Sequence, residues 1–200
     1  MENIEWLDRD LHKVFHGSSP DRGLEHLLKI WPDVVKEVPD ATLEIAYGFQ
    51  LFDRFYSDNP SSMAWKKRML EMMNYPGITD HGRLSQPEVT KLMKRCAVMA
   101  YPTHFGEINC ITALKSQALG LEPVVIDYAA LQTTVQYGKK IPGDIYDPET
   151  KVEFTKALID TLKNPMTEEK RKEMMKWAQD TFAWKKIANQ WIESFKEVKK

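Results

Sequence analysis

The stretch "YPTHFGEINCITALKSQALGLEPVVIDYAAL" (Tyr101–Leu131) decides the fold. Its first residues complete the apolar run "AVMAYP", which predicts a strand. Its middle has apolar residues at helical spacing and stops at Gly120, a residue typical of helix ends. "EPVVID" then predicts a second, fully buried strand. Two strands joined through a helix favour parallel pairing, so the loop before the helix should lie at the carboxyl edge of a parallel sheet.

The rest of the chain repeats this alternation, which favours a parallel sheet covered on both faces. The predicted class is α/β, a single Rossmann-like domain of about five or six strands with helices on both faces. One domain should span 1–200, with 1–13 a linker or artificial boundary and 167–200 the C-terminal helices. Strands are predicted over 12–17, 41–48, 77–82, 97–102 and 122–127. Helices are predicted over 24–38 (with a new turn at Pro32), 57–74, 85–96 (with a capping box of Ser85 and Glu88), 109–119, 147–164 and 167–198, the last broken near Phe182.

Composition restricts the function classes. The net charge of −1 gives no reason to expect a nucleic-acid partner. Cys96 and Cys110 have no metal-ligand spacing, so they should be reduced thiols of a cytoplasmic protein. No signal peptide opens the chain and no apolar run has the length of a transmembrane helix. The five histidines are not spaced as a metal cluster, and we expect no metal site.

The loop "HGSSPDRG" follows the first predicted strand and opens a helix. Ser18, Ser19 and Asp21 are candidate helix caps, and Gly23 allows a close turn. Arg22, beside the free N–H groups of the helix start, could bind a phosphate. The alternative is a solvated arginine in an ordinary strand-to-helix turn, which we favour on this stretch alone.

The loop "THFGEINC" precedes the helix of the opening stretch. The N–H groups of Ile108, Asn109 and Cys110 should point out of that helix and form an anion site, which Gly106 lets a ligand approach closely. Glu107 could accept hydrogen bonds from hydroxyl groups attached to the same anion, a pairing that a sugar diphosphate offers. The alternative, that Glu107 caps the helix, is equally good on this loop alone.

Three segments in order, "SSPDRGLEHLLKIWPDVVKEVPDATLEIAYG", "YPTHFGEINCITALKSQALGLEPVV" and "DYAAL", resemble the C-terminal, donor-binding half of GT-B glycosyltransferases of family four. The resemblance runs from about Val14 to Trp191. It implies a nucleotide-sugar-binding domain of a retaining enzyme that transfers a hexose from a UDP-sugar or GDP-sugar to a glycan or lipid-linked acceptor. The resemblance implies no cofactor. The sequence has no Asp-x-Asp motif in a plausible site, so we expect that no metal is required.

The resemblance also assigns roles to residues. Glu107 begins the E-x7-E motif and would bind sugar hydroxyls, and Arg22 would contact the diphosphate, so these two are the predicted catalytic residues. The backbone over 106–110 would hold the distal phosphate, while Gly82–Arg83 and Thr103–His104 would border the nucleoside. The predicted binding residues are Ser19, Gly23, Arg83, Thr103, His104, Gly106, Ile108, Asn109, Cys110 and Lys115.

Two positions depart from the family pattern. Lys115 stands where the second motif glutamate would hold the ribose hydroxyls. A lysine only donates hydrogen bonds, so it would reach a phosphate instead, or pair with Glu107 if the loop folds back. Gly17 stands where the family often has a second basic residue, so one phosphate contact would be lost.

Enzymes of this kind have two Rossmann-like domains, and the sequence predicts one. We therefore expect an enzyme that is incomplete without an N-terminal acceptor domain or a partner subunit, with a homo-oligomer also open. The alternative is a degenerate or partner-dependent binding module without catalysis. Trp177, Trp184 and Trp191 share a helical stripe that we expect to pack on the domain's own sheet, or else to form a seam with another domain.

Overall fold

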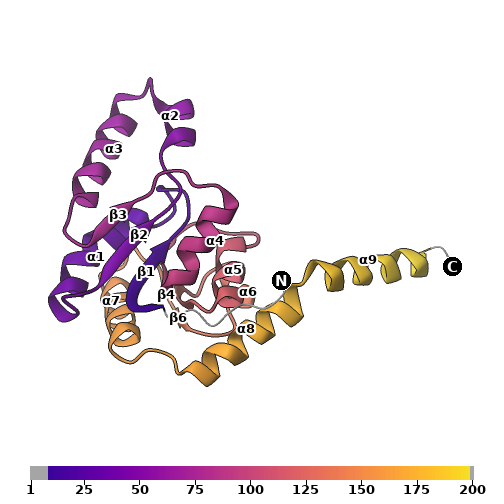
Figure 1. Ribbon diagram of the computed structural model, residues 1–200. Helices are drawn as coiled ribbons and strands as arrows, with labels where there is room; N and C mark the ends of the chain where they lie inside the picture. Colours follow the sequence, from indigo (N-terminus) through magenta and orange to yellow (C-terminus); the bar gives the residue numbers. More distant parts are fainter. Residues whose placement is uncertain (1–8, 199–200) are drawn as a thin grey trace.

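The computed structural model describes residues 9–198 and has one six-stranded parallel sheet in the order β3-β2-β1-β4-β5-β6 (Figure 1). The chain runs outward from β1 to β3, returns to pair β4 with the other side of β1, and continues outward to β6. The point between β1 and β4, where the direction reverses, is where such sheets bind ligands. The strands are β1 (Asp10–His16), β2 (Thr42–Ile45), β3 (Ile78–Asp80), β4 (Cys96–Tyr101), β5 (Glu122–Ile126) and β6 (Lys139–Ile141).

Helices cover both faces of the sheet, which confirms the predicted α/β class. On one face Val14, Leu43 and Val98 pack with buried residues of α1, α3 and α7. On the other, Phe15 and Met99 pack with α4, α5 and α6. The helices are α1 (Leu24–Glu37), α2 (Gln50–Tyr56), α3 (Pro60–Met73), α4 (Gln86–Arg95), α5 (Ile111–Leu119), α6 (Leu131–Thr134), α7 (Pro148–Lys163), α8 (Glu168–Phe182) and α9 (Trp184–Val198).

Several boundaries differ from the sequence prediction. The strand β1 begins at Asp10, so 10–13 belong to the sheet rather than to a linker, while residues 1–8 lie outside the described part of the chain. Helix α1 continues through Pro32 without a break. The strand β6 and the helices α2 and α6 were not predicted. Among these, β6 is only three residues long and contains two lysines, too short to show a hydrophobic period.

The C-terminal helices separate after Phe182, as predicted. Helix α8 packs on α5, whereas α9 extends away from the domain (Figure 1). Trp177 is half-buried against Tyr137, but Trp184 and Trp191 are 86% and 64% exposed. The expectation that the whole stripe packs on the sheet is therefore wrong, because the helix that carries its second half leaves the domain. Within the described residues, no helix has the length and apolarity needed to cross a membrane.

Candidate functional site

The loops after β1 and β4 meet at the switch point of the sheet. Gly23 has a φ of 108°, and a Cβ atom there would lie 2.5 Å from the carbonyl oxygen of Pro102. Only glycine lets the two loops approach this closely. The hydroxyl of Thr112 donates to the carbonyl of Gly17 at 3.2 Å, which ties the start of α5 to the first loop.

The first loop is closed by its backbone rather than by a side-chain cap. The N–H of Arg22 donates to the carbonyl of Ser19 at 2.9 Å. Helix α1 begins after Gly23, and no side chain caps it. The prediction that Ser18, Ser19 or Asp21 caps this helix is wrong, because a left-handed glycine occupies the cap position.

Arg22 is held in place by the second loop. Its guanidinium lies 3.8 Å from the centroid of the Phe105 ring, and its Nη1 lies 3.6 Å from Oε1 of Glu107. Its Nε is buried without a hydrogen-bond partner. Arg22 is therefore held against the second loop, with its side chain 36% exposed. An oriented and partly exposed guanidinium is suited to a phosphate oxygen.

Glu107 is hydrogen-bonded to the last residue of β4. The Tyr101 hydroxyl donates to Oε1 of Glu107 at 2.7 Å and lies 3.1 Å from Oγ of Ser18. Burial, with a contribution from Glu107, raises the pKa of Tyr101, so its hydroxyl stays protonated and donates. Among the described residues, none donates to Oε2 of Glu107. Glu107 does not cap α5, whose cap position is Cys110, and its free oxygen can accept a ligand hydroxyl.

Helix α5 begins at Ile111 rather than Asn109. The N–H groups of Ile108, Asn109 and Cys110 thus belong to the loop before the helix, and the Ile108 side chain is 98% exposed. Cys110 is buried, and burial raises the pKa of its thiol to about 11. A Cβ atom at Gly106 would lie 3.7 Å from the Tyr128 hydroxyl, an ordinary contact, so no neighbouring protein atom requires glycine there.

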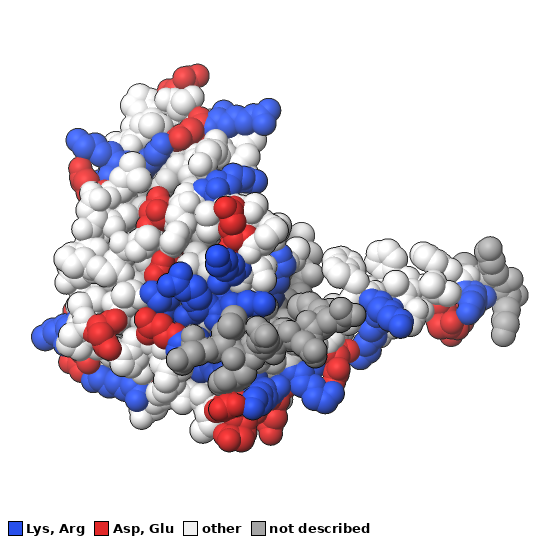
Figure 2. All heavy atoms as spheres, viewed as in Figure 1, with Lys and Arg blue, Asp and Glu red and all other residues white. Residues whose placement is uncertain are grey.

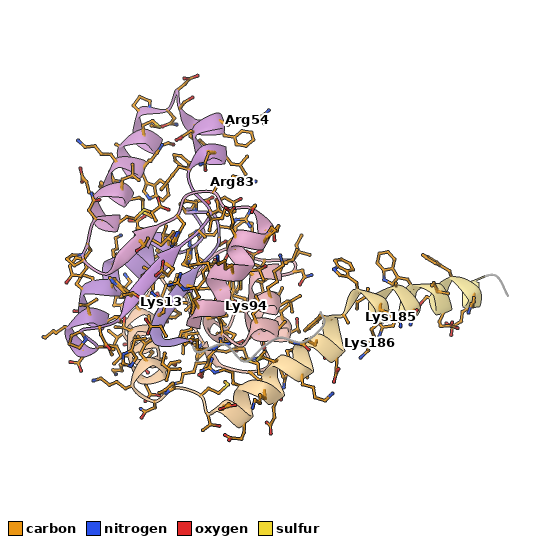
Figure 3. The ribbon with its side chains drawn as sticks, viewed as in Figure 1. Lys13, Arg54, Arg83, Lys94, Lys185 and Lys186 are labelled. Carbon is orange, nitrogen blue, oxygen red and sulfur yellow. The ribbon has the colours of Figure 1, made fainter. Side chains whose placement is uncertain are left out.

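A cavity of about 290 Å³ opens beside these loops, between the carboxyl ends of β1 and β2 and the helices α4 and α5. Its wall is largely apolar and includes the cations Arg83 and Lys115 (Figure 3 labels Arg83). The Arg83 guanidinium lies 5.9 Å from the Tyr47 ring centroid. The lining residues are Phe15, Gly17, Ala46, Tyr47, Arg83, Leu84, Gln86, Val89, Met93, Ile111, Thr112 and Lys115.

Lys115 does not pair with Glu107. Its Nζ donates to Oε1 of Gln86, at the start of α4. Glu107 instead pairs with Arg22 and Tyr101. The two positions of the E-x7-E pattern therefore lie in different surroundings. Glu107 lies beside the Arg22 guanidinium and the Tyr101 hydroxyl, while Lys115 lines the apolar cavity.

Thr103 and His104 line another cavity of about 290 Å³, beside the ends of β5 and β6. The Thr103 side chain is buried and accepts from the N–H of Phe105 at 3.0 Å. The His104 ring lies 5.1 Å from the Tyr146 ring. This cavity shares no lining residue with that of Arg83, so the structure does not bring together the two segments predicted to border one nucleoside. The described residues contain no group of three or more His, Cys, Asp or Glu suited to a metal ion.

Sequence reasoning missed three members of the site. Phe105 stacks on Arg22, Tyr101 holds Glu107, and Gln86 binds Lys115. Tyr101 had a usable signal, since it is the polar-tipped last residue of a buried strand at the ligand-binding edge. No sequence signal pointed to Gln86, because its partner Lys115 is 29 positions away in the sequence.

A family model described as "Glycosyl transferases group 1" matches residues 16–181. The fold is similar to that of pneumococcal O-GlcNAc transferase GtfA, solved with UDP and GlcNAc, at a TM-score of 0.73 and 16% identity over 95% of this chain and 36% of that one. It is also similar to Anabaena HepE in complex with UDP (TM-score 0.69, 16% identity, 93% of this chain and 49% of that one). A third similar structure is sucrose-phosphate synthase from Thermosynechococcus elongatus (TM-score 0.72, 19% identity, 93% and 45%).

These likenesses are to the fold, and the chain spans less than half the length of each of these three proteins. No curated protein matches the sequence.

Proposed function

The chain belongs to the glycosyl transferases group 1 family, and we propose that it is the nucleotide-sugar-binding domain of a retaining glycosyltransferase. The observation that carries this proposal is the cluster of Arg22, Glu107 and Tyr101 at the point where the strand order reverses. It combines an oriented cation, a carboxylate oxygen without a donor among residues 9–198, and an apolar cavity beside the two loops. These are the groups that a diphosphate, a sugar and a nucleoside need.

In this proposal Arg22 neutralises the diphosphate. Its guanidinium is oriented by Phe105 and Glu107 before the ligand arrives, so little side-chain entropy is lost on binding. When the bond between the sugar and the diphosphate breaks, negative charge grows on the departing phosphate. A preorganised guanidinium stabilises that charge more than it stabilises the intact donor, which is the condition for accelerating the reaction.

Glu107 positions the sugar in this scheme. Its Oε1 is engaged by Tyr101 and Arg22, which leaves Oε2 to accept from a donor-sugar hydroxyl. The sugar is a hexose and the nucleoside is uridine or guanosine in the reaction we propose. UDP and UDP-glucose are present in solved structures of similar fold, which supports uridine. Transfer retains the anomeric configuration, and the acceptor is a glycan or a lipid-linked group.

We further propose that activity requires an N-terminal acceptor domain or a partner subunit. The exposed apolar side chains of α9, which leaves the domain, support this requirement. We place the protein in the cytoplasm, since both its cysteines are free and buried.

The test is calorimetric titration of the folded chain with UDP, GDP, UDP-glucose, UDP-N-acetylglucosamine and GDP-mannose. We expect one nucleotide to bind and its sugar conjugate to bind more tightly. Arg22→Gln should lower the affinity for that nucleotide by about tenfold or more, because a charge-assisted hydrogen bond is lost. Arg54→Gln is the matched control, since Arg54 lies on α2 and lines neither cavity of the site. A folded chain that binds none of these ligands would refute the proposal.

The second candidate is a partner-dependent binding module without catalysis. The specific observation in its favour is the apolar face of α9, where Trp184, Trp191 and Phe195 are 86%, 64% and 64% exposed. One structure of similar fold is a complex of GtfA with GtfB (TM-score 0.75, 14% identity). A dimer in analytical ultracentrifugation that Trp184→Glu dissociates would support this candidate, provided that no nucleotide binds. An unchanged molecular mass would count against it.

A further inference from the structure

A second, shallow hollow adjoins the apolar cavity of the site. It is open to solvent, has a volume of about 560 Å³, and lies between α4 and α5. Its lining residues are Gln86, Pro87, Thr90, Lys91, Lys94 and Lys115. Gln86 and Lys115 line both hollows and are hydrogen-bonded to each other. These two residues therefore form a shared wall between the cavity and the second hollow.

The second hollow is strongly cationic. Half of its six lining residues are lysines and none is acidic. Among the described residues, no carboxylate forms an ion pair with Lys91, Lys94 or Lys115, whereas lysines such as Lys13 and Lys66 do pair with carboxylates. Figure 2 shows Lys and Arg side chains gathered on this face, where Figure 3 labels Lys94 on α4. Three ammonium groups without counter-charges raise the local potential and favour an anion.

The chemistry of the shared wall indicates which anion. Lys115 has three N–H donors and no acceptor, so it cannot accept hydrogen bonds from ribose hydroxyls. Its present partner is the neutral amide oxygen of Gln86, which a phosphate oxygen can replace with a stronger, charge-assisted bond. In other dinucleotide-binding sheets, the same exchange of a carboxylate for a cation accompanies a phosphorylated ribose. Lys91 and Lys94, one helical turn apart on α4, can contact the other oxygens of such a group.

We propose that the hollow formed by Gln86, Lys91, Lys94 and Lys115 is a phosphate subsite that selects a nucleotide whose ribose carries an additional 2′- or 3′-phosphate. This inference rests on the proposed function, because the nucleoside must occupy the adjacent apolar cavity. The 5′-diphosphate is bound by Arg22, so the two phosphate-binding positions are separate and can be tested separately. In this proposal the 5′-diphosphate contacts Arg22, and the phosphate on the 2′ or 3′ oxygen contacts the lysines of the hollow.

The test compares each nucleoside 5′-monophosphate (uridine, guanosine and adenosine) with its 3′,5′-bisphosphate and 2′,5′-bisphosphate by calorimetry at 150 mM salt. For the nucleoside that binds, we expect one bisphosphate to bind at least about tenfold more tightly than the monophosphate, the gain of one charge-assisted contact. The double variant Lys91→Ala/Lys94→Ala should remove that gain. Alanine preserves the helix. The matched control Lys67→Ala/Arg68→Ala removes two exposed cations from α3 and should keep the gain.

The possible outcomes separate this inference from the proposed function. Equal affinity for monophosphate and bisphosphates would overturn the phosphate subsite alone. A gain that the Lys91→Ala/Lys94→Ala variant keeps would also overturn it, since these lysines would not be the binding groups. Absence of any nucleotide binding would overturn both proposals. If the lysines instead bind a membrane, vesicles of phosphatidylserine will bind the wild type and not the double variant, without any preference for bisphosphates, and this too would overturn the nucleotide subsite.

Discussion

Glu107→Gln separates sugar recognition from nucleotide recognition. The glutamine keeps an oxygen that can accept from the Tyr101 hydroxyl, which now donates to Oε1 at 2.7 Å. It replaces Oε2 with an amide N–H₂ group, which donates and cannot accept from a sugar hydroxyl. It also removes the negative charge 3.6 Å from Nη1 of Arg22. The change therefore tests the acceptor role of one oxygen with little change in shape.

The expected magnitude follows from the burial of this carboxylate, whose side chain is only 13% exposed. A hydrogen bond to a charged group contributes about 1.5–3 kcal/mol, so the sugar conjugate should bind roughly 10- to 100-fold more weakly. The affinity for the bare nucleoside diphosphate should change by less than about threefold, because this ligand has no sugar hydroxyl and Arg22 keeps its contact with the Phe105 ring. The informative quantity is the ratio of the two dissociation constants, measured by calorimetry in one buffer.

The control is Glu149→Gln, which makes the same chemical change at an exposed position in the first turn of α7. It should leave both dissociation constants unchanged. If Glu107→Gln lowered the affinities for the diphosphate and for its sugar conjugate by the same factor, Glu107 would act on the phosphates or on the loop. The sugar-binding role would then be refuted.

Three further predictions concern the framework of the site. Gly23→Ala should destabilise the protein by about 1–3 kcal/mol in urea unfolding, because φ is 108° and the new methyl group would meet the Pro102 carbonyl at 2.5 Å; an unchanged midpoint would show that the two loops can separate without cost. Arg171→Ala should lower the free energy of unfolding by about 3–5 kcal/mol in the same assay. The buried guanidinium donates to the carbonyls of Ala97 and Gly120 and compensates the buried carboxylate of Glu122. A loss below about 1 kcal/mol, the size expected for a surface substitution, would contradict this. Burial lowers the pKa of His16 to about 4, so the buried neutral ring contributes roughly 3 kcal/mol to the free energy of unfolding above pH 6.5, and this contribution is lost as the pH falls toward 4. The variant His16→Gln should therefore lose less stability than the wild type between pH 7 and pH 5. An unchanged dependence on pH would refute the assignment.

The sequence was sufficient for the elements that bury one continuous apolar face. The strands β4 and β5 and the helix between them were predicted because their apolar runs and Gly120 act locally. The proximity of Arg22 and Glu107 could also be predicted, since both follow parallel strands at the same edge of the sheet. Contacts that depend on the packing of distant segments could not, and the Lys115 bond to Gln86 is one of them.

Helix α9 illustrates a different limit. Its apolar stripe was visible in the sequence, and a stripe predicts that one face of a helix will be covered. The pattern does not say what covers it. The simplest expectation was the domain's own sheet, yet Trp184 and Trp191 lie on a helix that extends away from that sheet. The predicted stripe is also divided, because Trp177 lies on α8 and Trp184 begins α9. Packing of the whole stripe on the sheet is therefore wrong, and a seam with another domain stays a prediction.

The different surroundings of Glu107 and Lys115 explain how one motif position can change while the other does not. Glu107 is bound to Tyr101 from β4 and to Arg22 from the first loop, so replacing it by a cation would put two like charges 3.6 Å apart in a largely buried position. Lys115 faces a half-open wall whose other residue, Gln86, can accept as well as donate. A charge reversal there costs little in the free protein. Its consequence falls on the ligand, because a wall that donates hydrogen bonds beside Lys91 and Lys94 favours phosphate where a carboxylate would favour hydroxyl groups.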